Sequence, residues 1–228
     1  GDRSGDCRAF VRGLATRLAA RGGTIHFDTR ATDFACEGER AAAVKTSRGE
    51  LRADAFVLAL GAHTPLLARR LGAELPIYPV RGLGLTVPVA DAHRAPRLGA
   101  IDESRLLAYA RYGDQLRVTS RAELRGYDTR HRPEEFRSML EAMGTLFPGA
   151  AHWDRFQGWA GLRPMTPTGL PVLGRGGRSN VWVNAGQGYL GWTMAAGSAR
   201  ITADLIAGRP PGIDVEPMRL ASRPRRAA

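Results

Sequence analysis

A short apolar run, AFVLAL at residues 55–60, constrains the fold of this chain more than any other feature. Nearly every side chain in it is apolar, which predicts a strand that is covered on both faces, as in the sheet of an α/β protein. Gly61 ends the run and lets a ligand approach the backbone at the carboxyl edge of the sheet, where α/β proteins bind ligands. Many strands end in glycine without a ligand nearby, so this position alone leaves both interpretations open.

The residues before this run predict a helix followed by short strands. Apolar side chains recur every four residues at Phe10, Leu14 and Leu18, which predicts a helix over 5–21. Ser4 or Asp6 can cap its start, and the glycines at 22–23 end it. Strands are expected at 24–28, 31–36 and 41–46. We expect an α/β fold with a three-layer arrangement around the strands 24–28, 55–60 and 181–183.

The middle of the chain has a different pattern. Prolines and strand-like segments alternate over 75–122, and the sequence YGDQ at 112–115 is typical of a hairpin turn. These features predict an antiparallel sheet with strands near 84–89, 105–112 and 115–120. A helix is expected over 133–147, because Pro133 can open it and apolar side chains share one of its faces.

Composition narrows the classes of function. The 228 residues fit one large domain or two small ones, and no apolar run approaches the roughly 20 residues of a membrane-spanning helix. The net charge is +11, but the 32 arginines are spread along the chain without a binding motif, so we expect no nucleic-acid partner. Cys7 and Cys36 lie far apart and the five histidines form no ligand pattern, so we expect no metal site and a reducing compartment.

The segment WAGLRPMTP at 159–167 holds one arginine in a restricted backbone. Gly161 and Pro164 lie close to Arg163 on either side. A guanidinium group offers a planar fork of donors that suits a carboxylate. The alternative is a surface arginine in a rigid turn, which the arginine-rich composition favours.

The segment NAGQGYLGWT at 184–193 joins a predicted strand at 181–183 to a helix of small residues over about 192–207. Such a turn presents free backbone N–H groups at a helix N-terminus, an arrangement that binds anions. Its glycines match G-x-G-x-x-G at 186–191, although a single match of this kind is weak. The alternative is an ordinary left-handed turn between strand and helix.

Taken together and in order, five segments resemble the C-terminal half of the D-amino-acid dehydrogenase family. This family comprises FAD-dependent members of the D-amino-acid oxidase, glycine oxidase and sarcosine oxidase superfamily. The sequence departs from the family pattern at Thr168 (usually aspartate), Gln187 (usually histidine) and Arg81 (usually lysine). The matching segments are GDCRAF at 5–10, ADAFVLALGAHTP at 53–65, LPIYPVRGLGLT at 75–86, WAGLRPMTPTGLPVLG at 159–174 and GYLGWTMAAGSARITADLIAG at 188–208.

The resemblance implies a partial FAD-binding, Rossmann-like domain and an antiparallel-sheet substrate domain. The expected division is an FAD-domain part at 1–74, the substrate domain at 75–160, a return to the FAD domain at 161–212 and a basic tail at 213–228. The family's FAD-binding G-x-G-x-x-G lies near its N-terminus, in a βαβ unit that this sequence does not contain. We therefore expect the chain to be the second half of a longer enzyme.

The resemblance also implies a reaction and a site. The family transfers a hydride from the substrate Cα to flavin N5 and gives an imine, which water converts to a 2-oxo acid and ammonia. No general base is needed, so no catalytic side chain is expected. Arg163 would bind the substrate carboxylate, and Tyr109, Tyr112 and Tyr189 would line the pocket unless they pack in the core. The implied FAD-binding residues are Ala59, Gly61, Gly186, Gly188, Leu190, Gly191, Trp192 and Thr193.

Two further expectations concern Gly191 and the partners of the chain. We expect Gly191→Val to lower flavin occupancy, because a β-branched side chain is strained at a turn that needs close approach. The expected partners are a small D-amino acid, the missing N-terminal FAD-binding half, and a quinone or the respiratory chain as electron acceptor. The expected location is the cytoplasm, or the inner face of the bacterial membrane. The alternatives are a glycine- or sarcosine-type amine oxidase and a non-catalytic truncated product or subunit.

Overall fold

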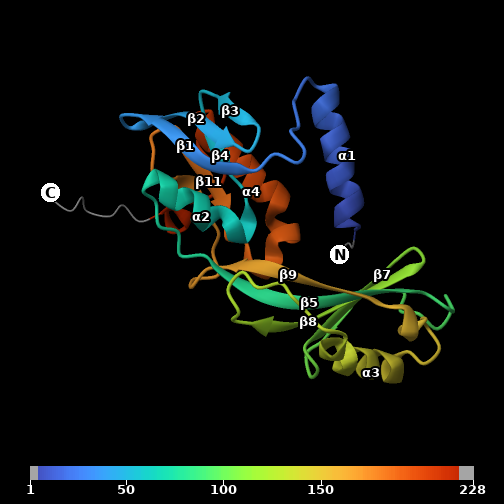
Figure 1. Cartoon of the computed structure of the whole chain (residues 1–228). Helices are drawn as coiled ribbons and strands as arrows, with labels where there is room; N and C mark the ends of the chain where they lie inside the picture. The colour runs from blue at the N-terminus through green and yellow to red at the C-terminus, as the bar shows by residue number, and fades with distance from the viewer. Residues whose placement is uncertain (1–4, 221–228) are drawn as a thin grey trace. The chain divides into compact units, whose positions relative to one another are not determined.

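The computed structural model describes residues 5–220 and contains both helices and sheets, as the sequence predicts (Figure 1). The helices are α1 (Cys7–Ala20), α2 (Thr64–Ala68), α3 (Arg137–Leu146) and α4 (Gly191–Ile206). The first eight strands are β1 (Ala31–Glu37), β2 (Arg40–Thr46), β3 (Gly49–Arg52), β4 (Phe56–Leu58), β5 (Tyr78–Pro88), β6 (Ala100–Asp102), β7 (Leu107–Tyr112) and β8 (Gln115–Glu123). The last three are β9 (Gln157–Met165), β10 (Val172–Arg175) and β11 (Val181–Ala185).

The chain divides into two compact units, each built from two stretches of sequence. The first unit contains the described residues up to Ile25 together with Val80–Leu162. The second contains His26–Pro79 together with the residues from Arg163 onward. Each unit has its own core.

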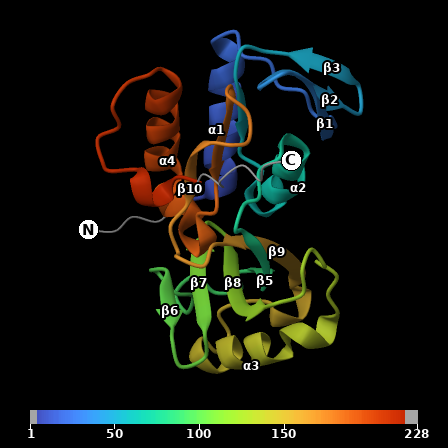
Figure 2. The same cartoon turned by 90° about the vertical axis from the view of Figure 1, so that its left-hand side faces the viewer.

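The first unit is built on a five-stranded sheet in the order β6-β7-β8-β5-β9 (Figure 2). The pairs β6–β7, β7–β8 and β8–β5 are antiparallel, which confirms the antiparallel sheet predicted for this part of the chain. The hairpin turn closes with Tyr112 opposite Gln115. One face of the sheet packs against α3, and the buried side chains between them are Leu83, Leu85, Val87, Leu107, Leu116, Val118, Phe136, Met139 and Met143.

Helix α1 also belongs to the first unit and forms where the sequence predicts. The carboxylate of Asp6 accepts hydrogen bonds from the backbone N–H groups of Arg8 and Ala9, at 2.9 and 3.2 Å, and so caps the helix. The helix has no buried residue, and its apolar stripe is 50–54% exposed at Phe10, Val11, Leu14 and Leu18. The described chain therefore leaves this stripe largely uncovered.

The second unit contains two three-stranded sheets, β1-β2-β3 and β10-β11-β4. Two predictions about this region are wrong. Residues 24–28 form no strand, since turns and irregular backbone occupy that segment. The strand near 55–60 is covered on one face only: Phe56 and Leu58 are buried, whereas Val57 is 45% exposed, because nothing in the described chain packs on its side of this edge strand.

A buried amide joins distant segments of the second unit. The side-chain NH₂ group of Asn180 donates to the carbonyl oxygens of Ala41 at 2.8 Å and Asp54 at 3.0 Å. Its Oδ1 accepts from the backbone N–H of Ala41 at 2.8 Å. We expect Asn180→Ala to lower the free energy of unfolding by about 2–4 kcal/mol, because buried backbone groups lose their partners. Urea denaturation measures this; Ser179→Ala, at an exposed neighbour, should change it by less than about 0.5 kcal/mol.

A buried guanidinium group holds the first unit's loops to its sheet. The Arg81 side chain is fully buried, and its nitrogens lie 3.1 Å from Glu123 Oε2 and 2.5 Å from Glu135 Oε1. It also donates to the carbonyl oxygen of Arg130 at 2.7 Å. The backbone N–H of Arg132 donates to Glu135 Oε2 at 2.7 Å, and this bond, with the Arg81 charge, lowers the pKa of Glu135.

This lowered pKa predicts a pH dependence of stability. Because the folded state favours the ionised form of Glu135, its contribution should be complete above the ordinary pKa of a glutamate. It should be lost as the pH falls through the lower, folded-state pKa. The measurement is the free energy of unfolding against pH for the wild type and Glu135→Gln. The gap between the two curves should narrow toward acid pH, and a constant gap would contradict the assignment.

Candidate functional site

The carboxyl ends of two parallel strands meet at one edge of the second unit's β10-β11-β4 sheet. Strands β11 and β4 pair in parallel, with Val181 opposite Phe56 and Val183 opposite Leu58. Beyond β4 the chain passes through exposed Ala59 to Gly61, whose φ is +55°; beyond β11 it reaches Gly186, whose φ is +85°. Both glycines adopt left-handed backbone, which other residues enter only at a cost. A Cβ built on Gly61 would project into open space.

Helix α4 begins at the same edge. It follows the 3₁₀ turn Gly188–Leu190, and no side chain caps its first residues. Around this start the side chains of Tyr189, Leu190, Trp192 and Thr193 are exposed. The edge thus combines the positive end of a 16-residue helix with exposed apolar and aromatic surface.

Close contacts with other residues of the chain constrain the turn from β11 to α4. A Cβ at Gly186 would lie 2.8 Å from Thr166 Cγ2, and one at Gly188 would lie 3.1 Å from Met165 Sδ. Gly191 differs, because its φ is −54° and a Cβ there would have its nearest neighbour at 3.8 Å. The chain itself therefore imposes no strain at Gly191, because the backbone is already helical there, and Gly186 and Gly188 are the constrained positions. The loss of flavin expected for Gly191→Val stays a prediction.

Arg163 lies in β9, in a regular strand and not in a surface turn. Its side chain is about half buried, and this loss of hydration lowers the pKa of its guanidinium from the ordinary value. An arginine in such a place stays charged and binds an anion more strongly than a fully hydrated one does. The strand position excludes the surface turn, and carboxylate binding by Arg163 stays a prediction.

The three predicted pocket tyrosines lie in different surroundings. Tyr109 packs edge-on against Phe147, 5.2 Å between ring centroids, beside the core formed with α3. Tyr112 ends β7, and the Arg117 guanidinium carbon lies 5.4 Å from its ring centroid. Tyr189 is 72% exposed in the turn before α4. Tyr109 therefore packs against the core, whereas Tyr112 and Tyr189 are accessible from outside the core.

Arg117 is a further arginine of the sheet that the sequence alone did not single out as a candidate site residue. It lies in β8 between Leu116 and Val118, which are both fully buried against α3. Because side chains alternate along a strand, Arg117 points to the second face of the sheet, away from α3. The alternation Leu-Arg-Val-Thr at 116–119 was the available signal, but it is hard to read among 32 arginines.

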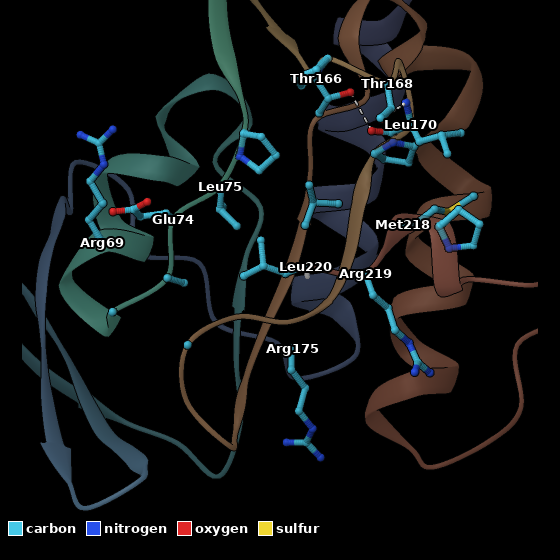
Figure 3. A pocket seen from close by; sticks show the side chains of 18 residues that line it. Arg69, Glu74, Leu75, Thr166, Thr168, Leu170, Arg175, Met218, Arg219 and Leu220 are labelled. Carbon is cyan, nitrogen blue, oxygen red and sulfur yellow. Dashed lines mark hydrogen bonds between the residues drawn. The ribbon is translucent and has the colours of Figure 1, made fainter. Parts of the chain in front are cut away.

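A further cavity of the second unit lies away from these residues. It has a volume of about 890 Å³ and is lined by the segments 69–76, 166–177 and 217–220. Figure 3 shows Leu75 and Leu220 pointing into it, with Arg69, Arg175 and Arg219 around its rim. None of the predicted site residues lines it. Its wall ends at Leu220, and the rest of the predicted basic tail, 221–228, lies outside the described residues.

Within the described residues, no three His, Cys, Asp or Glu side chains gather as metal ligands would. No helix in this part of the chain is long and apolar enough to span a bilayer.

Comparison with known proteins identifies the family. The sequence model of the family described as FAD dependent oxidoreductase (DAO) matches residues 1–205. The chain belongs to this family. Among relatives of the DAO family, D-amino acid dehydrogenase 2 of Mesorhizobium japonicum is 42% identical over 214 residues, which are 93% of this chain and 51% of that protein. D-amino acid dehydrogenase of Cereibacter sphaeroides is 45% identical over 215 residues, 94% and 49% of the two chains.

The chain thus spans about half the length of the curated relatives that it matches. Solved structures show the same fold. Glycine oxidase from Geobacillus kaustophilus superposes with a TM-score of 0.80 at 23% identity, over 95% of this chain and 57% of that one. L-proline dehydrogenase from P. horikoshii gives 0.79 at 19%, over 92% and 57%. At these identities the likeness is one of fold.

The sheet edge formed by Gly61 and the turn Gly186–Thr193, which we call the glycine edge, fits the cofactor of the DAO family. FAD combines negatively charged phosphates with a planar ring system. Open backbone at Gly61 and the uncapped start of α4 offer N–H groups and a positive helix end. The exposed Trp192, Leu190 and Tyr189 offer surface on which a ring can pack.

Proposed function

We propose that this chain forms the substrate-binding part, and one side of the FAD site, of an enzyme that oxidises D-amino acids to 2-oxo acids and ammonia. The relatives named D-amino acid dehydrogenase support the reaction. The observation that carries the proposal is the parallel pairing of β4 with β11, because it brings Gly61 and the Gly186–Thr193 turn to one sheet edge. That edge is where α/β folds bind nucleotide cofactors.

The chain's residues then have distinct tasks. FAD, when bound, supplies the chemistry by accepting the hydride that leaves the substrate Cα. The positive end of α4 stabilises negative charge on the cofactor, an effect of about 0.3–1 kcal/mol at an exposed helix end. Arg163 binds the substrate carboxylate and fixes the orientation of Cα. Ala59 and Gly61 would line the pyrophosphate or adenosine side of FAD, and the residues on its ring side would be Gly186, Gly188, Leu190, Gly191, Trp192 and Thr193.

The isolated 228-residue chain is expected to purify colourless and to self-associate. The βαβ unit that holds the cofactor phosphates is absent from the sequence. Exposed apolar side chains remain on α1 and around β4, at Phe10, Val11, Leu14, Leu18, Val57, Leu60 and Leu66. Absorbance in the flavin band with and without added FAD, and sedimentation velocity, measure both properties. A yellow, monomeric preparation would show that the cofactor site has been misplaced.

Product analysis tests the reaction. The complete protein, with its FAD-binding half, should release equal amounts of 2-oxo acid and ammonia from D-alanine and none from L-alanine. Glycine and sarcosine belong in the same assay, because the fold is shared with glycine oxidase. Turnover of glycine or sarcosine but not of D-alanine would replace the proposal with the amine-oxidase alternative.

A further inference from the structure

On the face of the five-stranded sheet that points away from α3, small side chains surround one arginine. Strand alternation places Arg117 and Thr119 on this face, since Leu116 and Val118 point to α3. Figure 2 shows β7, β8 and β5 side by side, with α3 on the other face. The register gives the cross-strand neighbours: Ala110 and Thr86 flank Arg117, and Ala108 and Gly84 flank Thr119. No large side chain therefore adjoins Arg117 across the strands.

Two aromatic rings stand beside this arginine. The Arg117 guanidinium carbon lies 5.4 Å from the centroid of the Tyr112 ring and 5.9 Å from that of Trp159. A Cβ on Gly84 would overlap the Trp159 indole, so the glycine makes room for this ring. Contacts of this kind favour a cation and remove water from its faces. The two rings therefore fix the guanidinium in place and partly desolvate it.

The charge of Arg117 lacks a counter-ion. Its Nε is buried and has no hydrogen-bond partner, and within the described residues no carboxylate pairs with the side chain. Arg81, in the same unit, differs because two glutamates lie within ion-pair distance of its guanidinium group. A partly desolvated cation without such partners is costly unless an anion completes it.

We propose that Arg117 is a specificity-determining residue that binds a carboxylate group of the substrate on this face of the sheet. The inference rests on the proposed function, in which Arg163 binds the α-carboxylate, so the carboxylate that Arg117 binds is the side-chain carboxylate of an acidic amino acid. The planar donor fork of arginine matches a carboxylate, and the neighbouring Thr86 and Thr119 hydroxyls add hydrogen-bonding groups on the same face.

A binding measurement on the 228-residue chain tests this without flavin or turnover. Propionate is the probe, propionamide is its uncharged counterpart, and tryptophan fluorescence is the signal. The wild type should show a saturable response to propionate that Trp159→Phe removes. Arg117→Met should weaken propionate binding about tenfold or more, since a charge-assisted hydrogen bond is lost. Arg117→Lys should be intermediate, because it keeps the charge without the fork.

Arg111→Met is the matched control. Arg111 lies on the adjacent strand and donates to the carbonyl oxygens of Gly113 and Ala92, so its loss should leave propionate binding unchanged. A structural role for Arg117 would alter the responses to propionate and propionamide alike and lower the melting temperature. This structural outcome would overturn the proposal. So would an unchanged affinity for propionate in Arg117→Met, or the absence of a saturable propionate response in the wild type.

Kinetics of the complete enzyme test the source of the carboxylate. Arg117→Met should raise KM for D-glutamate and leave KM for D-alanine unchanged. An equal rise for both substrates would assign Arg117 to the α-carboxylate and overturn the inference. An unchanged KM for both substrates would overturn the inference. If the wild-type enzyme oxidises no D-amino acid, the proposed function fails, and the propionate titration still decides whether Arg117 binds carboxylates.

Discussion

Replacing Arg81 with leucine is expected to lower the free energy of unfolding by about 3–5 kcal/mol, the usual cost of breaking a buried ion pair by removing one partner. The side chain is fully buried, and its removal takes away the cation that Glu123 and Glu135 share, leaving, among the described residues, only the longer ion pairs with Arg121 at 3.3 Å and Arg125 at 3.7 Å. The carbonyl oxygen of Arg130 loses its donor as well. The midpoint of urea denaturation at neutral pH measures the effect.

Two further variants serve as controls for Arg81→Leu. Arg81→Lys keeps the charge and should lose less, although its ammonium cannot reach all three acceptors at once. Arg94→Leu removes an arginine that is 63% exposed and paired only with Asp91 at 3.4 Å. The loss there should be about 0–1 kcal/mol. Equal losses in Arg81→Leu and Arg94→Leu would contradict the structural role of the Arg81 network.

Arg163→Leu in the complete enzyme is expected to raise KM for the D-amino acid by about tenfold or more. A charge-assisted pair with a carboxylate contributes about 1.5–3 kcal/mol, and about 1.4 kcal/mol corresponds to a factor of ten. FAD content should not change, because Arg163 lies in β9 and not at the glycine edge. Steady-state kinetics and flavin absorbance measure the two quantities.

The matched control is Arg155→Leu. Arg155 is 69% exposed and lies 3.9 Å from Asp154, so both KM and FAD content should stay as in the wild type. An unaltered KM in Arg163→Leu would remove this residue from carboxylate binding. A loss of flavin in the same variant would instead assign it to the cofactor site.

Periodicity predicted the elements whose packing lies within this chain. The apolar side chains of α1 and α3 recur at helical spacing, and both helices form within a few residues of the predicted bounds. Local signals were also sufficient for the turn at Gly113 and for the glycine turn before α4. These features depend on neighbours that are close in sequence, so the sequence alone carries the information.

Predictions failed where long-range contacts decide the structure. The run at 55–60 is apolar enough for a strand covered on both faces, yet Val57 is exposed because the described chain supplies no layer on that side. Asn180 gave no signal, because its partners Ala41 and Asp54 are more than a hundred residues away. Arg117 was hidden by the abundance of arginine, and only its partners distinguish it from a solvated surface residue.

The most direct test of the central proposal is the flavin absorbance of the complete protein under anaerobic conditions. This chain, joined to its FAD-binding half, should give a yellow protein whose flavin band is bleached by D-alanine and not by L-alanine. Bleaching without oxygen requires the amino acid itself to reduce the cofactor, so it reports on the site that Arg163 and the glycine edge are proposed to form. A flavin band that D-amino acids leave unchanged would contradict the proposal.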